Sequence, residues 1–128
     1  MSIPTIHLTL VFLGGGLGAV SRYWLSGLVY QKLGTGFPYG TLAVNVLGCL
    51  LIGVLMTAME ERFLTTPAVR IFFTIGILGG FTTFSTFSFE TISLLRDGQV
   101  ISATANILLS LTTCLFGTWI GMQAGKLL

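Results

Sequence analysis

Long apolar stretches separated by short polar segments form the main pattern along this chain. Crossing the apolar core of a bilayer as a helix takes about 20 residues. Four stretches meet that length, at about 7–31, 40–59, 68–95 and 100–126. The segments between them are rich in glycine, proline or charge, which is typical of loops. The pattern predicts an all-α integral membrane protein with four transmembrane helices in one domain, 1–128.

The composition supports a membrane protein and argues against several other classes. Of the 128 residues, 53% are hydrophobic and only 8% are charged, whereas about a quarter of an ordinary soluble domain is charged. A formal net charge of +2 is too small for a nucleic-acid-binding surface. The sequence has neither a nucleophile–base pair nor a cluster of metal ligands, and His7 is its only histidine. We therefore expect no enzyme.

The two cysteines, Cys49 and Cys114, both fall inside apolar stretches. Their spacing fits neither a paired metal-binding motif nor a disulfide framework. We interpret them as small buried apolar residues.

The third apolar stretch contains a segment that is a poor helix former. Its two adjacent glycines, Gly79 and Gly80, have the highest backbone entropy cost in a helix short of proline. The side chains of the adjacent Thr82 and Thr83 compete for backbone hydrogen-bonding groups. This segment lies near the midpoint between Arg70 and Arg96. We predict a helix broken at mid-membrane, with a first half ending near Gly79 and a second half capped by Thr83.

The two helix ends at such a break carry opposite partial charges. Free carbonyls near Gly79 favour a cation, and free N–H groups after Thr83 favour an anion. Broken backbone at membrane depth is tolerated only where it is buried in protein or lines a cavity. The break is therefore our candidate functional site.

The basic residues predict no preferred orientation in the membrane. With four helices, the N-terminus, the 60–67 loop and the C-terminus share one side, which carries Arg62, Arg70 and Lys126. The other side carries Lys32 and Arg96, with Arg22 in the nearer half of the first helix. The difference in the number of basic residues between the two sides is too small for the positive-inside rule to favour one orientation. We predict dual topology and an antiparallel homodimer in which the two breaks meet on a two-fold axis, around a small hard cation.

Polar groups lie within the first, second and fourth predicted helices. Arg22 either extends to the interface or provides a fixed positive charge at a vestibule, where it attracts anions. Asn45, with Thr41 one turn before it, either packs helices together or lines a pathway. Asn106 and Ser110 share one face of the fourth helix. Together these faces suggest a narrow polar groove.

The second half of the third helix has its own candidates. Phe84 and Phe87 lie on one face, where they either pack in the core or turn electropositive ring edges toward an anion. Thr83 and Ser85 supply hydroxyl donors. Glu90, the only acid inside a span, either couples protons or neutralises an arginine near the exit.

Glycines at four-residue spacing mark two further helix faces. One comprises Gly14 and Gly18, and the other comprises Gly117, Gly121 and Gly125. Such small-residue stripes predict close contacts between helices.

Three motifs resemble those of the Fluc (CrcB) fluoride channels. They are GGGLGAVSRY at 14–23, GTLAVNVLG at 40–48 and GGFTTFSTFS at 79–88. The resemblance extends over the whole chain in length, number of helices and motif order. It implies a dual-topology, antiparallel homodimer in the bacterial inner membrane that conducts fluoride passively and protects cells from it. It also implies two pores per dimer.

The resemblance assigns roles to individual residues. Backbone carbonyls of Gly79 and Thr82 from both chains would hold one central structural sodium ion. Phe84 and Phe87 match phenylalanines that line the fluoride path, and Asn45 matches a pore-facing asparagine.

The remaining matches lie toward the ends of that path. Arg22 matches an arginine by the vestibule, and Glu90 lies near one vestibule. Thr41, Asn106 and Ser110 fall along a polar track. Cys114 takes a place where the family pattern leads us to expect serine.

Two other classes of function compete with a channel. A proton-coupled exporter of the small multidrug type also has four short helices and dual topology, but it needs an acid in the first helix, and none occurs before residue 31. An assembly module packed through glycine stripes would not need Asn45, Arg22 and a helix break together.

Overall fold

The computed structural model describes residues 2–62 and 65–128, and in these residues every regular element is helical. The elements are α1 (Thr5–Leu33), α2 (Tyr39–Arg62), α3 (Pro67–Arg70), η1 (Ile71–Leu78), α4 (Gly79–Phe81), α5 (Phe84–Arg96) and α6 (Val100–Lys126). Elements α3 to α5 together form one bent helix, Pro67–Arg96. The prediction of four long apolar helices is confirmed.

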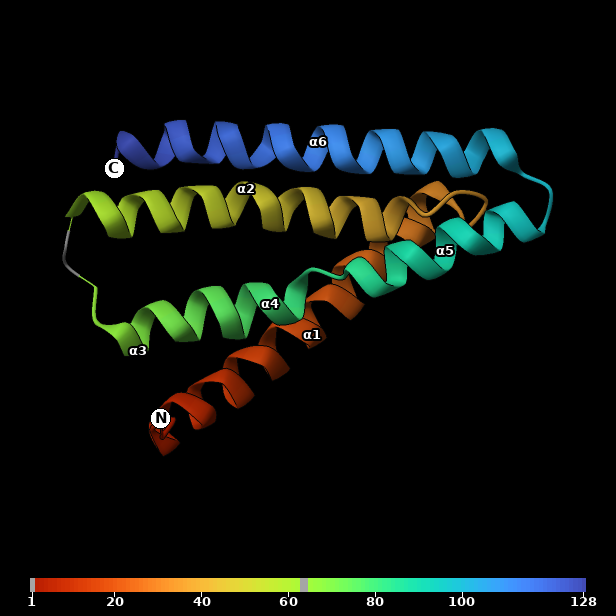
Figure 1. Ribbon diagram of the computed structural model, residues 1–128. Helices are drawn as coiled ribbons and strands as arrows, with labels where there is room; N and C mark the ends of the chain where they lie inside the picture. The colour runs from red at the N-terminus through yellow and green to blue at the C-terminus, as the bar shows by residue number, and fades with distance from the viewer. Residues whose placement is uncertain (1, 63–64) are drawn as a thin grey trace.

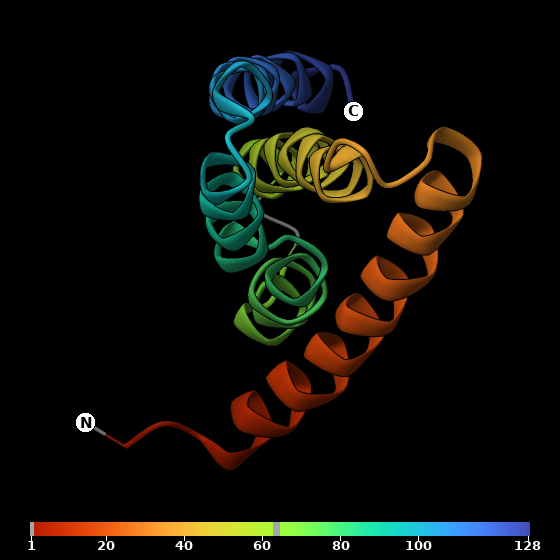
Figure 2. The ribbon, with the colours of Figure 1, turned by 90° about the vertical axis from the view of Figure 1, so that its right-hand side faces the viewer.

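The four helices alternate in direction along the chain (Figure 1). The two termini lie at the same end as the start of α3, and the loop after α1 lies at the opposite end with the turn before α6. Helices α2 and α6 lie side by side and make the most extensive contact. Helix α1 crosses the others obliquely and packs on η1 and α4 (Figure 2).

Local signals in the sequence account for several helix ends. Thr66 caps α3, because its side chain accepts a hydrogen bond from the Val69 N–H at 3.3 Å. Pro67 follows at the first helical position, where its missing N–H costs nothing. Gly34 ends α1 at φ 83°, and Gly98 forms the turn before α6 at φ 76°. Only glycine adopts such angles without strain.

Glycines set the distance between the packed helices. A Cβ atom at Gly18 would overlap the Ile77 carbonyl of η1, and one at Gly80 would lie 2.5 Å from the Gly15 oxygen of α1. A Cβ at Gly121 of α6 would likewise overlap the Leu50 carbonyl of α2. The glycine faces predicted on the first and fourth helices are therefore close helix contacts.

The bent third helix differs from the prediction in two ways. Its first half continues through Gly79 to Phe81 instead of ending near Gly79. Helix α1 packs directly against Gly80, which offsets the entropy cost of keeping this segment helical. The eight residues of η1 form a π-helix that the sequence pattern did not predict. Such segments are rare and are frequently found at functional sites.

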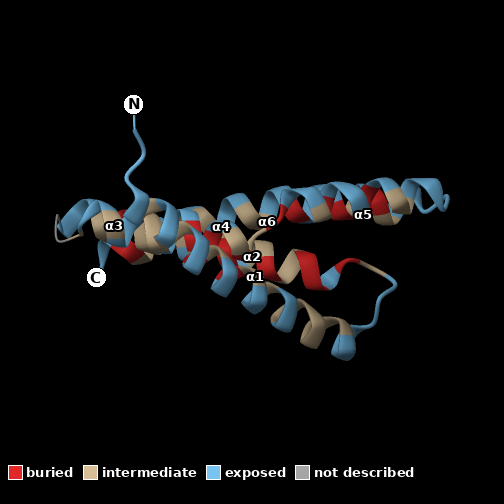
Figure 3. Ribbon diagram, turned by 90° about the horizontal axis from the view of Figure 1, so that it is seen from below, coloured by how far each residue is buried: buried red, intermediate tan, exposed pale blue. Residues whose placement is uncertain are grey.

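Burial along the helices is the reverse of that in a soluble protein. Many large apolar residues are exposed, and exposed residues occur along all of the long helices (Figure 3). The buried polar residues are Thr41, Thr57, Thr83, Thr91, Asn106 and Ser110. The buried apolar residues are Val44, Leu78, Phe81, Phe87 and Ala103. This distribution suits a chain whose outer surface faces lipid or another apolar surface, and whose polar groups pair internally.

Candidate functional site

The break in the third helix consists of Thr82 and Thr83. Both are extended, at φ −92°, ψ 158° and φ −152°, ψ 107° respectively. The Thr82 N–H makes the last helical bond of the first half, to the Leu78 carbonyl at 3.1 Å. Its hydroxyl donates to the same carbonyl at 3.0 Å. The backbone groups of Thr83 therefore need partners from outside the third helix.

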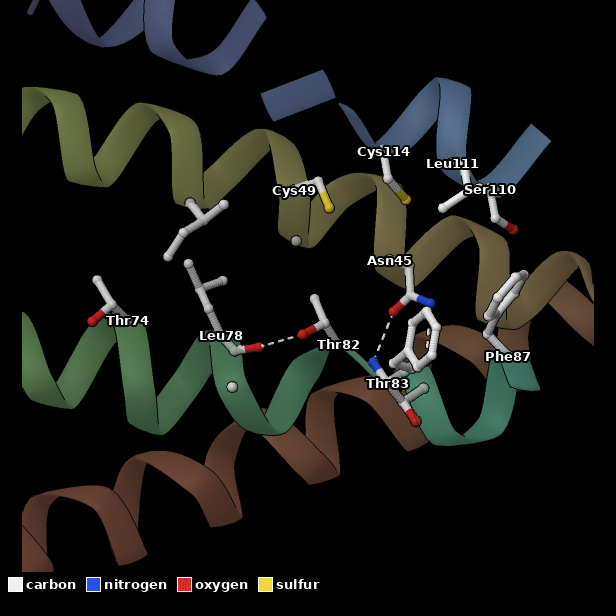
Figure 4. Close-up of a pocket in the computed structure, with 14 residues that line it drawn as sticks. Asn45, Cys49, Thr74, Leu78, Thr82, Thr83, Phe87, Ser110, Leu111 and Cys114 are labelled. Carbon is white, nitrogen blue, oxygen red and sulfur yellow. Dashed lines mark hydrogen bonds between the residues drawn. The ribbon is translucent and has the colours of Figure 1, made fainter. Parts of the chain in front are cut away.

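Asn45 of α2 supplies both of those partners. The Thr83 N–H donates to Asn45 Oδ1 at 2.7 Å, and Asn45 Nδ2 donates to the Thr83 carbonyl at 3.0 Å (Figure 4). A buried polar group left unpaired costs about 1–3 kcal/mol. The amide thus stabilises the extended conformation at the break and explains an asparagine in the middle of an apolar helix.

Thr83 also caps α5, as predicted from the sequence. Its Oγ1 accepts from the Thr86 N–H at 3.2 Å, and its hydroxyl hydrogen points to Thr86 Oγ1 at 2.9 Å. The Ser85 hydroxyl lies 3.3 Å from Thr83 Oγ1. Thr83 is buried, whereas Ser85 is exposed. The hydroxyl of Thr83 is therefore occupied by its own helix end.

The end of the first half offers backbone oxygens. In an α-helix the Gly79 carbonyl would accept from the N–H of residue 83, but the Thr83 N–H donates to Asn45 instead. The last carbonyls of a helix lack internal partners and carry partial negative charge. Gly79 and Thr82 also line one cavity. Their oxygens are the ligand type that small hard cations prefer, so these residues fit a sodium ion.

A cavity of about 330 Å³ lies beside the break, between the third helix, α2 and α6 (Figure 4). It brings together seven of the predicted site residues, namely Asn45, Gly79, Thr82, Thr83, Phe84, Phe87 and Ser110. The sequence patterns did not single out Gly48, Cys49, Ile52, Thr74, Leu78, Leu111 and Cys114 as a group, yet they line it too. The wall is therefore largely apolar, with a few convergent polar groups.

The two phenylalanines lie on one face of α5, as predicted. Their ring centroids are 5.3 Å apart and the rings are tilted by 49°. Phe87 is 9% exposed, whereas Phe84 is 73% exposed. Phe87 is thus held by this chain alone, while the outer side of Phe84 is open to lipid or a second protein surface.

A second cavity of about 260 Å³ contains the predicted vestibule charges. It is lined by Arg22, Thr41 and Glu90, together with Tyr30 and others. Thr83 lines this cavity as well as the first. The buried Thr83 is therefore a shared wall between the two cavities. Thr41, predicted to share a face with Asn45, lies here and not beside the phenylalanines.

Glu90 is held by hydroxyl groups. Its Oε1 accepts from the Thr41 hydroxyl at 2.8 Å and from the Tyr30 hydroxyl at 3.3 Å. Its Oε2 is buried without a partner among the described residues. In residues 2–62 and 65–128 Glu90 forms no ion pair, so the predicted neutralisation of an arginine is not seen as a direct contact. Tyr30 was not predicted; its only signal is a hydroxyl near a span end.

The polar residues of α6 join it to α5. Asn106 is 1% exposed and donates from Nδ2 to Thr91 Oγ1 at 2.9 Å. The Thr91 hydroxyl donates to the Phe87 carbonyl at 2.7 Å, and the Ser110 hydroxyl donates to Asn106 Oδ1 at 3.3 Å. Asn106 therefore belongs to a buried network with Thr91 and Ser110, and of these three residues only Ser110 lines the first cavity.

A family model and individual relatives of known name point to the same protein family. Residues 9–122 match the family model of CrcB-like protein, Camphor Resistance (CrcB). A protein of Geotalea uraniireducens (strain Rf4) named Fluoride-specific ion channel FluC is 53% identical over 89% of this chain and 92% of its own length. A protein of the same name from Geobacter sp. (strain M21) is 52% identical to this chain over 95% of this chain and 98% of its own length.

These relatives are named ion channels, and no catalytic family is indicated. The four long apolar helices and these relatives place the chain among the multi-pass proteins of the bacterial inner membrane. The matched family model leaves out only the first 8 and the last 6 residues of the 128. The chain belongs to the CrcB family.

Proposed function

We propose that this chain forms a passive, fluoride-selective channel that exports fluoride from the cytoplasm and so confers fluoride resistance. One observation carries the proposal: the cavity at the helix break joins Asn45, Phe84 and Phe87 in a chain about half identical to proteins named fluoride channels. No step in this function requires a catalytic group, so we do not assign the chain an enzyme activity.

The first cavity has groups suited to a dehydrated small anion. A side-chain amide carries two N–H hydrogens, and Asn45 uses one for the Thr83 carbonyl. Its second N–H remains for an anion in the cavity. The ring edges of Phe84 and Phe87 are electropositive. Fluoride gains most from such close donors because it is small and strongly hydrated, whereas the larger chloride fits poorly and interacts more weakly.

The second cavity has the charge expected at an entrance. Arg22 lines it and draws anions toward the protein. Glu90 lines the same cavity with Oε1 held by two hydroxyl groups, which fixes the carboxyl group in place. Because Thr83 separates the two cavities, an anion moving from Arg22 to the phenylalanines would pass this residue.

The direction of net movement follows from the membrane potential. Hydrogen fluoride is a weak acid that crosses membranes as a neutral molecule and ionises in a less acidic cytoplasm. An inside-negative potential favours outward movement of an anion by about 2.3 kcal/mol per 100 mV. A passive pore is therefore sufficient for export, without a coupled ion.

We propose that two chains assemble as an antiparallel homodimer, with both breaks at mid-membrane on the two-fold axis. Three observations support this arrangement: nearly balanced basic residues at the two ends, large exposed apolar side chains, and the 73% exposure of Phe84 beside the cavity. A second chain would close the open side of the cavity.

We also propose a structural sodium ion between the two breaks. The carbonyls of Gly79 and Thr82 from both chains would hold it, since the usual helical donor to Gly79 is bonded to Asn45. A bound cation supplies positive charge that offsets the aligned carbonyl dipoles. In its absence those oxygens would repel one another across the axis.

The competing functions fit less well. A proton-coupled drug exporter would need an acidic residue in α1, and α1 contains none. The acid that lines the second cavity is Glu90, in α5. A pure assembly module would have no use for a cavity at a helix break. Drug-dependent proton movement in liposomes would favour the exporter.

The central prediction concerns ion selectivity in liposomes. Vesicles loaded with potassium fluoride or potassium chloride, with valinomycin and a proton ionophore present, should release fluoride rapidly and retain chloride. Ion-selective electrodes measure both. Absence of fluoride release from a well-folded dimer would refute the proposed function.

Substitutions at the phenylalanines extend the same assay. Phe87→Ile or Phe84→Ile should slow fluoride release by about tenfold or more, which corresponds to about 1.4 kcal/mol in the barrier. Phe89→Ile is the matched control, because Phe89 is exposed on the same helix and lines neither cavity. If all three variants release fluoride at the same rate, Phe84 and Phe87 do not line the fluoride path.

The antiparallel arrangement predicts half-labelling in intact cells. Single cysteines placed by Lys32→Cys or Lys126→Cys lie at opposite ends of the helices, in a chain also carrying Cys49→Ala and Cys114→Ser. A membrane-impermeant maleimide should label about half of the chains at either position. A uniform orientation would instead give nearly complete labelling at one position and almost none at the other.

Removal of sodium should weaken the dimer. With N-methylglucamine in place of sodium, we expect the dissociation constant of the dimer to rise about tenfold or more, since the loss of 1.4 kcal/mol has that effect. Single-molecule photobleaching in bilayers counts chains per particle, and readdition of sodium should restore the dimer. An unchanged dimer fraction would contradict the sodium site.

A further inference from the structure

Two cysteine thiols from different helices line the first cavity. Cys49 comes from α2 and Cys114 from α6, and both are half-buried and free. Both line the cavity, and Figure 4 shows both sulfur atoms directed into it. Helices α2 and α6 are close together near the two thiols, since a Cβ at Gly117 would lie 3.5 Å from the Val46 carbonyl oxygen.

The ligand set at this position selects a particular class of ion. Thiolates are soft ligands that favour soft metals. Structural zinc takes four ligands, and the described residues contain no group of three or more His, Cys, Asp or Glu side chains. A pair of thiols therefore suits ions that are stable with two ligands in a line, such as Hg²⁺, Ag⁺ and Cu⁺.

Charge distinguishes among those ions. Binding of a divalent ion to two thiols forms two metal–sulfur bonds and releases two protons to water, which leaves a neutral complex. A monovalent ion bound in the same way leaves one negative charge. The nearby wall contains Ile52, Leu78 and Leu111, and an uncompensated charge in apolar surroundings is costly.

We propose that Cys49 and Cys114 form a dithiol site for a soft divalent metal ion, with Hg²⁺ as its representative, at the edge of the helix-break cavity. Binding itself does not depend on the proposed channel function. Its consequence does: an ion held by both thiols lies in the cavity that contains Phe84 and Phe87, so it obstructs fluoride movement.

Native mass spectrometry of the purified dimer tests the binding step. With Hg²⁺ as the probe, each wild-type chain should gain one mercury and lose two protons. Chelation by two linked ligands typically strengthens binding by about a hundredfold or more, so this adduct should withstand a monothiol wash that strips mercury from the Cys49→Ala and Cys114→Ser variants. The double variant should bind none.

Two patterns of mercury binding would overturn the proposal. One is two mercury ions per chain, each replacing a single proton, because the thiols would then act separately. The other is an ion that links two chains, seen as a mercury-bridged chain pair after denaturation. Absence of mercury binding would also overturn it.

Fluoride release from liposomes tests the position of the site. Hg²⁺ should slow fluoride release through the wild-type protein by about tenfold or more, a barrier change of about 1.4 kcal/mol. For the double variant, the rate of release should be the same with and without Hg²⁺. A bridged ion that leaves wild-type release intact would refute obstruction. If the wild-type protein releases no fluoride at all, the channel proposal fails, and the mass measurement still decides whether the dithiol site exists.

Discussion

The pair of hydrogen bonds between the Asn45 amide and the backbone of Thr83 is the interaction on which the site depends. Inside a membrane protein, backbone donors and acceptors have no water to bind, so each needs a partner within the protein. A continuous third helix would satisfy Thr83 internally. In this chain α2 satisfies it instead, and the third helix can be interrupted without two unpaired polar groups. The break is therefore held by a specific contact and does not arise from weak helix propensity alone.

Several features follow once the break is held open. The N–H of Thr83 donates to Asn45 and not to the Gly79 carbonyl, and both Gly79 and Thr82 line the first cavity. The next helix begins with Thr83 as its cap, which aims Phe84 and Phe87 along one face. Thr83 itself is buried between that cavity and the one containing Arg22. The proposed cation site before the break and the proposed anion path after it would both depend on this single backbone interruption.

The sequence predicted the elements better than the partners. Apolar length is sufficient for four helices, and a threonine after a glycine-rich segment is sufficient to identify Thr83 as a cap, because both signals are local. The first half ends at Phe81, two residues beyond the predicted end near Gly79, because propensity cannot show that α1 packs against Gly80. Partners of polar side chains depend on helix rotation, so the pairing of Glu90 with Tyr30, and that of Asn106 with Thr91, was not predicted. The π-helix in η1 has no sequence signal that we recognise.

Hydrogen–deuterium exchange at the break tests the central role of Asn45 most directly. In the wild-type protein, peptides covering residues 82–84 should exchange slowly even though Thr83 is not helical, because its N–H donates to Asn45. In an Asn45→Leu variant the same amide should exchange about tenfold faster or more, as expected for the loss of roughly 1–3 kcal/mol, while peptides from α6 keep their protection. Rapid exchange at Thr83 in the wild-type protein, or no change in the variant, would contradict the account.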